Sequence, residues 1–106
     1  MNILSTLNYS PPANGAIVAV MTATFDCETG QPIDFGASCS YLFRVTQSGV
    51  TRSSPGQRLG RARARYVLDW TTTIDPSAPV VFELAFISGV VTTVYAATFK
   101  VEIIKR

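Results

Sequence analysis

Six arginines lie between residues 44 and 65 with no acidic residue among them. They are Arg44, Arg52, Arg58, Arg61, Arg63 and Arg65. Of the nine basic and seven acidic residues in the chain, this leaves three basic and all seven acidic residues elsewhere. Charge segregated in this way attracts polyanions or an acidic protein surface, and the guanidinium fork suits bidentate contact with carboxylate or phosphate. We therefore take these six arginines as the candidate partner-binding residues.

Three interpretations of the arginine-rich segment stay open at the level of sequence. The first is a solvated strand face that discourages edge pairing. The second is docking on a protein partner, such as the acidic segment that holds Asp26, Glu28 and Asp34 on a neighbouring copy. The third is binding to nucleic acid, which is less favoured because Tyr66 and Trp70 are predicted to point to the opposite, buried face.

Residues for catalysis are scarce. The chain has no histidine, which removes the commonest general base and the commonest metal ligand. The segment from Gly56 to Gly60 lacks the Lys-Ser/Thr ending of a phosphate-binding loop and the spacing of a dinucleotide motif. We therefore expect a protein that is not an enzyme and that needs no cofactor.

Metal and redox chemistry are also disfavoured. Asp26, Glu28 and Asp34 share one segment and could bind calcium, but their spacing is not that of an EF-hand, and solvated acids explain them better. Cys27 and Cys39 are too far apart for a redox CxxC motif. They could form a disulfide across a hairpin, although two reduced, buried thiols are favoured in a chain that shows no export signal.

Composition limits the size and setting of the molecule. A chain of 106 residues suits one domain, so we assign residues 1–106 to a single unit. Apolar residues make up 47% of the chain and charged residues only 15%, so part of the surface is expected to be covered by another subunit. We find no membrane-spanning apolar run and no signal peptide at the start of the sequence, which favours synthesis in a cytoplasm.

The elements that must position the arginines are predicted to be strands. Residues 2–9 are expected to form an edge strand and residues 16–25 a central strand with two nearly apolar faces. Residues 26–38 are expected to form a loop. Further strands are expected at 39–46, 61–70, 80–87 and 90–105, with turns at Pro55-Gly56 and 75–79 and a tight hairpin at Ser88-Gly89.

Alternation decides which side chains face the core. In 61–70 the residues Ala62, Ala64, Tyr66, Leu68 and Trp70 share one face, and Arg61, Arg63 and Arg65 share the other. A helix from Ser54 to Arg65 is the rival, although Gly56 and Gly60 weigh against it. Either structure predicts one basic face. The aromatic residues Trp70, Phe82, Phe86, Tyr95 and Phe99 are expected to form a core cluster.

Short strands separated by turns predict an all-β fold, a single antiparallel β-sandwich of six to seven strands, immunoglobulin-like or jelly-roll-like. Our leading hypothesis for function is a non-enzymatic structural protein, a homo-oligomer that docks on copies of itself or on a larger scaffold. A virion component, such as a capsid decoration or tail protein, is one setting that would suit it. The alternative is a nucleic-acid-binding module that uses the arginine-rich segment 44–65.

Overall fold

The computed structural model describes residues 2–11, 17–29, 39–58, 64–88 and 92–105, which form eight strands and no helix. The strands are β1 (Asn2–Tyr9), β2 (Ile17–Thr29), β3 (Cys39–Gln47), β4 (Val50–Ser53), β5 (Gln57–Arg58), β6 (Ala64–Ile74), β7 (Val80–Ser88) and β8 (Thr92–Lys105). No helix long and apolar enough to cross a membrane occurs in these ranges. The all-β prediction is confirmed, with more strands than expected.

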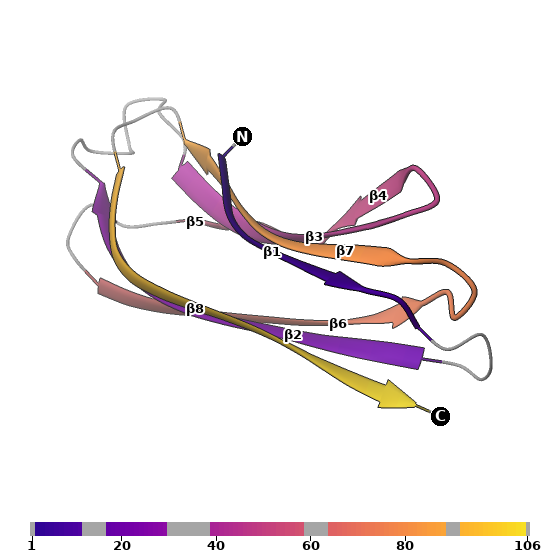
Figure 1. The fold of residues 1–106 in the computed structure, drawn as a ribbon. Helices are drawn as coiled ribbons and strands as arrows, with labels where there is room; N and C mark the ends of the chain where they lie inside the picture. Colours follow the sequence, from indigo (N-terminus) through magenta and orange to yellow (C-terminus); the bar gives the residue numbers. More distant parts are fainter. Residues whose placement is uncertain (1, 12–16, 30–38, 59–63, 89–91, 106) are drawn as a thin grey trace.

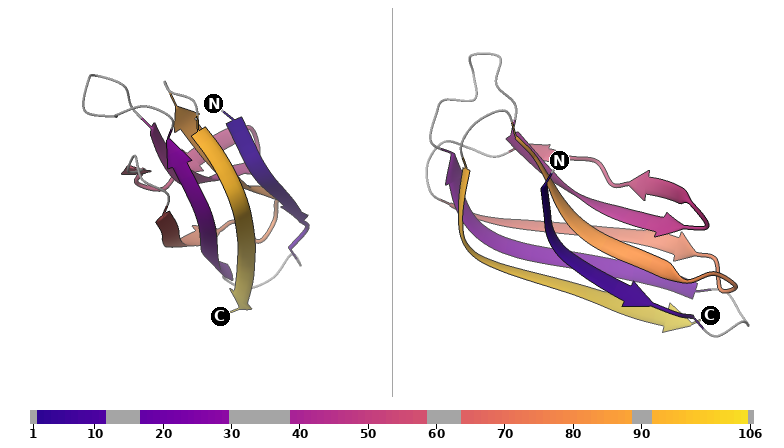
Figure 2. Two further views of the ribbon diagram at one scale, coloured as in Figure 1. Left: turned by 90° about the vertical axis from the view of Figure 1, so that its left-hand side faces the viewer. Right: turned by 45° about the horizontal axis from the view of Figure 1, so that its top comes forward.

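The strands form two antiparallel sheets. One sheet has the order β1-β7-β3-β4, and β5 pairs with the same edge of β3 as β4 does. The other sheet has three strands in the order β6-β2-β8. Figure 1 shows the sheets as an upper and a lower layer, and Figure 2 shows β1 and β8 on the same side of the molecule.

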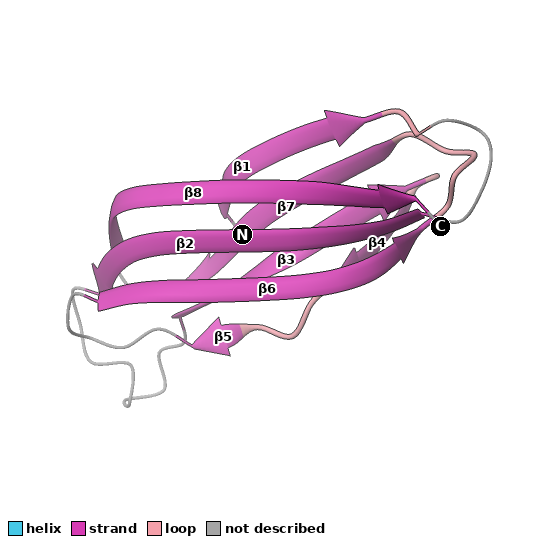
Figure 3. Cartoon of the chain, turned by 90° about the horizontal axis from the view of Figure 1, so that it is seen from below, coloured by secondary structure: helices cyan, strands magenta, loops and turns pink. Residues whose placement is uncertain are grey.

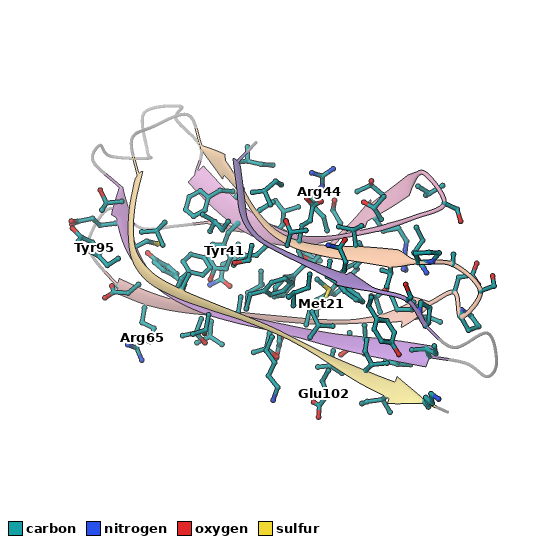
Figure 4. The ribbon with its side chains drawn as sticks, in the orientation of Figure 1. Met21, Tyr41, Arg44, Arg65, Tyr95 and Glu102 are labelled. Atoms are coloured by element: carbon teal, nitrogen blue, oxygen red, sulfur yellow. The ribbon has the colours of Figure 1, made fainter. Side chains whose placement is uncertain are left out.

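The hydrophobic core lies between the two layers. Alternate residues of β2, from Ile17 to Cys27, are buried on its inner face, as the predicted central strand requires. Phe25 packs edge-on against Tyr41 of the other sheet, with ring centroids 4.0 Å apart. Met21 and Tyr41 both point into the space between the layers (Figure 4). Burial of each such large side chain contributes about 1.5–3 kcal/mol to folding.

Strand β2 extends further than predicted. Residues 26–29 continue β2, with Asp26 paired to Arg65 and Cys27 to Ala64 across the ladder to β6. The alternation of buried and partly exposed residues simply continues, because Cys27 is an apolar residue at the next inward position. The acidic residues Asp26 and Glu28 had suggested a loop, but they lie on the outward side of a paired strand, and Asp34 lies outside the described residues.

The polar segment after β3 is also more regular than predicted. The chain turns at Ser48-Gly49, where both residues have positive φ angles of 51° and 77°, which suits a two-residue hairpin between paired strands. Pro55-Gly56, where a turn was predicted, interrupts an edge strand made of β4 and β5. Proline is tolerated there because the outer side of an edge strand needs no N–H donor. The rival helix is absent from the described part of residues 54–65.

Ser54 preserves the pairing at this interruption. Its backbone N–H donates to the Phe43 carbonyl at 2.9 Å, and its side-chain hydroxyl accepts from the Phe43 N–H at 2.9 Å. The hydroxyl therefore substitutes for a backbone carbonyl where the strand is interrupted, and Ser54 is buried.

Two further predictions were wrong. Strands β7 and β8 belong to different sheets, so Ser88-Gly89 does not close a tight hairpin between paired strands. Tyr95 is not a core residue, because it is 46% exposed and its hydroxyl donates to the Glu28 carboxylate. The other four aromatic residues of the predicted cluster are buried or packed against the core: Trp70, Phe82, Phe86 and Phe99.

Candidate interaction surface

Arg44 is held in an ion pair. It lies on the outer face of β3, directly across the ladder from Glu83 of β7, and its guanidinium is 3.8 Å from the Glu83 carboxylate. Both side chains are partly buried. Glu83 therefore neutralises much of the charge that Arg44 would offer to an external anion.

Arg52 binds the opposite sheet. Its guanidinium donates to the Thr72 hydroxyl at 2.7 Å and to the Thr73 carbonyl at 2.8 Å, both on β6. Gln47 reinforces this edge, since its side chain donates to the carbonyls of Asp75 and Ala78 and accepts from the Asp75 N–H. This polar seam closes one side of the gap between the layers, and Arg52 acts in it as a cross-link.

Arg65 lies far from Arg44. It is exposed on the outer face of β6, below the lower layer in Figure 4, whereas Arg44 lies above the upper layer. Arg58 pairs through its backbone with Ser40 of β3, and its side chain lies outside the described part of the chain, as do Arg61 and Arg63. The arginines whose side chains are described thus do not share one basic face. The expected strand alternation is nevertheless confirmed for Arg65, with Tyr66 packed against the core.

The broadest regular surface is the outer face of the three-stranded sheet, which Figure 3 views from below. Four successive rows of paired residues cross it from β6 through β2 to β8. They are Thr73-Val18-Ile104, Thr71-Val20-Glu102, Asp69-Thr22-Lys100 and Val67-Thr24-Thr98. We call these twelve residues the Thr/Val face. Nine of them are threonine, valine or isoleucine, so a surface open to solvent is largely made of β-branched side chains.

This face carries exposed apolar groups beside three charged residues. Val67 is 59% exposed and Ile104 is 44% exposed. Among the described residues, the side chains of Asp69, Lys100 and Glu102 form no hydrogen bond or ion pair. Sequence reasoning missed this surface because it considered β2 only as a core strand. The alternation of Val18, Val20, Thr22 and Thr24 was nevertheless visible in the sequence.

The open side of the molecule lies between β1 and β8. A shallow groove there is lined by Leu7, Asn8 and Tyr9 of β1, by Phe82, and by Val101 and Ile103 of β8. No polar seam comparable to that of Arg52 closes this side among the described residues. The two lateral sides of the molecule therefore differ. Hydrogen bonds from Arg52 and Gln47 join the two sheets on one side, and the groove between β1 and β8 lies on the other.

Chemical groups for catalysis or metal binding do not gather elsewhere in the described residues. No set of three or more His, Cys, Asp or Glu side chains within those ranges could hold a metal ion. Cys27 is a buried thiol, and burial raises the pKa of the neighbouring Tyr41 hydroxyl well above its ordinary value. These groups are shielded from solvent and from any substrate.

Comparison with models of protein families gives no match, and comparison with curated proteins gives no similar sequence.

Proposed function

We propose that the protein is a non-enzymatic structural subunit that assembles with copies of itself or with a larger scaffold. The observation that carries the proposal is the Thr/Val face, where an open sheet surface exposes β-branched side chains around three charged residues. Exposed apolar surface of this kind marks protein interaction sites. The low charge of the chain as a whole points the same way. A repeated subunit of this kind would suit a virion, as a capsid decoration or tail protein.

The outer face of the other sheet has a buried centre. Leu42 and Ala85 are paired near its centre and are already buried, although they point away from the core. Next to them, Arg44 is paired with Glu83. Ile3 and Ile87 lie on the same face and are each 41% exposed, so a partner could cover some apolar surface there as well.

We further propose that the two layers form a β-sandwich of immunoglobulin-like connectivity with its end strands exchanged. The immunoglobulin fold places strands A, B and E in one sheet and C, F and G in the other. Strands β2, β3, β6 and β7 match B, C, E and F in order and pairing. The last strand, β8, takes the place of A beside β2, and the first strand, β1, takes the place of G beside β7. Both β1 and β8 are edge strands in this arrangement, and an unpaired strand edge is a suitable site for contact with neighbours.

The test is the solution mass of the purified chain, measured by light scattering over roughly a hundredfold range of concentration. We expect a mass that rises with concentration above that of the 11.5 kDa chain. If the purified chain stays monomeric over the whole concentration range, self-assembly is removed from the proposal.

Binding to nucleic acid is the outcome that would favour the alternative function. A protein that tracks phosphates binds DNA or RNA at low salt and loses affinity steeply as salt rises. The described arginines give this alternative little support, because Arg44 and Arg52 have protein partners and Arg65 lies on another face. A filter-binding titration at low salt tests it directly, and we expect no binding there.

A further inference from the structure

The Thr/Val face has a charge pattern that is complementary to itself. Lys100 and Glu102 are adjacent outward residues of β8, one in each of the two central rows. On β6 the same two rows carry Asp69 and Thr71. The residues Met21, Trp70 and Val101 form the inward-facing row between them. A two-fold axis can be placed outside the sheet, parallel to that inward row and perpendicular to the strands. A second copy generated by this axis faces the first, and each central row of one copy then lies opposite the other central row of its partner.

We propose that two copies of the chain pack face to face through the Thr/Val face, with their strands antiparallel about this axis. The inference rests on the proposed function and names the surface and the partner. Each Lys100 then faces Glu102 of the partner subunit, and each Glu102 faces the partner subunit's Lys100. On β6, Asp69 faces the hydroxyl of the partner's Thr71, so no carboxylate meets another.

The apolar residues match in the same arrangement. On β2, Val20 faces the partner's Thr22 and Val18 faces the partner's Thr24, so that β-branched side chains of similar size meet along the centre. On β6, Val67 faces the partner's Thr73. In aligned sandwiches the strand axes of the two sheets lie within about 30° of each other. The antiparallel arrangement meets this condition, because its strands run along nearly the same line in opposite senses.

The other symmetric arrangement has its axis along β2. It also joins opposite charges, because Asp69 of each copy would face the partner's Lys100, but it leaves Glu102 opposite the partner's Thr71. An axis that runs along β2 would place each β2 residue against its own copy, so Asp26 would meet Asp26 and Glu28 would meet Glu28. Like charges placed directly opposite each other across an interface are strongly unfavourable. The antiparallel arrangement avoids this contact, because Asp26 and Glu28 lie beyond the region of overlap.

The area of the face sets the strength of the contact. With a strand spacing of about 4.8 Å and a rise of about 3.4 Å per residue, three strands overlapping for some ten residues cover roughly 500 Å² per copy. The total of roughly 1,000 Å² is at the lower limit of specific interfaces. We therefore expect a reversible dimer with a dissociation constant in the micromolar range.

Charge reversal tests the arrangement. In Lys100→Glu, Glu102 of the partner meets a new carboxylate, and in Glu102→Lys two ammonium groups meet. We expect each single variant to weaken the dimer at least about tenfold. The double variant K100E/E102K restores opposite charges and regains the native dissociation constant. An equimolar mixture of the two single variants forms a heterodimer, because one chain then carries two carboxylates and the other two ammonium groups.

Asn8 provides the matched control. It is exposed on β1 of the other sheet, and Asn8→Glu and Asn8→Lys introduce charges of both signs away from the Thr/Val face. We expect both variants to dimerise like the native chain. Circular dichroism and thermal unfolding of every variant verify that the fold is kept. Masses are measured by sedimentation equilibrium at two salt concentrations, with a weaker native dimer expected at the higher one.

The outcomes separate this inference from the proposed function. A native dimer that both single variants leave intact overturns the face-to-face arrangement while self-assembly stands through another surface, and dissociation by the Asn8 variants would then place it at the groove beside β1. A dimer disrupted by Lys100→Glu but not by Glu102→Lys also overturns it, in favour of contact between Lys100 and Asp69. A native chain that is monomeric at every concentration removes this dimer and self-assembly together, and leaves docking on a larger scaffold as the proposed function.

Discussion

Burial of the Tyr41 hydroxyl does not stabilise the folded chain. The residue is fully buried on β3, and its hydroxyl has no hydrogen-bond partner among the described residues. Its ring, in contrast, is well packed, edge-on against Phe25 at 4.0 Å and against Tyr66 at 5.8 Å between centroids. Replacement of Tyr41 by phenylalanine keeps the ring contacts and removes only the hydroxyl.

The expected effect is stabilisation. A buried polar group without a partner costs about 1–3 kcal/mol, since the unfolded chain hydrogen-bonds it to water. Tyr41→Phe should therefore raise the free energy of unfolding by about 1–2 kcal/mol at neutral pH. In a domain of this size each kcal/mol raises the melting temperature by roughly 4 °C or more.

The gain should also depend on pH in a defined direction. Burial raises the pKa of Tyr41 well above its ordinary value near 10, with smaller contributions from the neighbouring Cys27 and Tyr66. Above pH 10 the unfolded chain releases this proton while the folded chain retains it. Native stability is thus full below pH 10 and falls by about 1.4 kcal/mol per pH unit above it from this group alone. Tyr41→Phe lacks this loss, so its advantage should widen in alkali.

Urea unfolding of the native chain and the variant, followed by circular dichroism at pH 7 to 11, measures both effects. Tyr9→Phe is the control, because Tyr9 is half-buried on the edge strand β1 and its replacement should change stability by less than about 0.5 kcal/mol. Destabilisation by Tyr41→Phe at neutral pH, or an advantage that stays constant up to pH 11, would refute the reasoning.

Two further substitutions probe how the sheets are held. Arg52→Ala removes both hydrogen bonds to β6 and should lower the free energy of unfolding by about 1–2 kcal/mol. Arg52→Lys should recover only part of this free energy, because lysine lacks the guanidinium fork. Equal stability of all three proteins in urea would show that the hydrogen bonds of Arg52 are dispensable. Ser54→Ala leaves the Phe43 N–H without its acceptor and should lower the free energy of unfolding by about 1–2 kcal/mol, whereas Ser54→Thr keeps the hydroxyl. An alanine variant as stable as the native chain in the same assay would contradict the role of the serine.

The strands and their faces could be predicted from sequence because they depend on local alternation. The inward set of β6, with Tyr66, Leu68 and Trp70, was correct, as was the edge position of β1. Errors arose where polar residues were taken as a sign of loop structure. Asp26 and the residues of β4 lie in strands because neighbouring strands satisfy their backbone groups, and no local propensity reports such a neighbour.

The candidate site could be predicted less well, because charge along a sequence does not show direction in space. The sequence places Arg44, Arg52 and Arg65 in one basic segment. The fold sends Arg44 to the outer face of one sheet, turns Arg52 across the gap to β6, and leaves Arg65 on the outer face of the other sheet. Two of the three thereby acquire protein partners.

The sequence by itself determined the all-β class, the inward faces of the main strands and the scarcity of catalytic groups, since each follows from residue type and a period of two. Only the tertiary structure decided which strands pair. It placed β7 and β8 in different sheets, and it aligned Lys100 and Glu102 with the threonines and valines of β2 and β6 on one open face. The physical reason is that strand order and register depend on long-range pairing and shared burial, which no stretch of ten residues encodes.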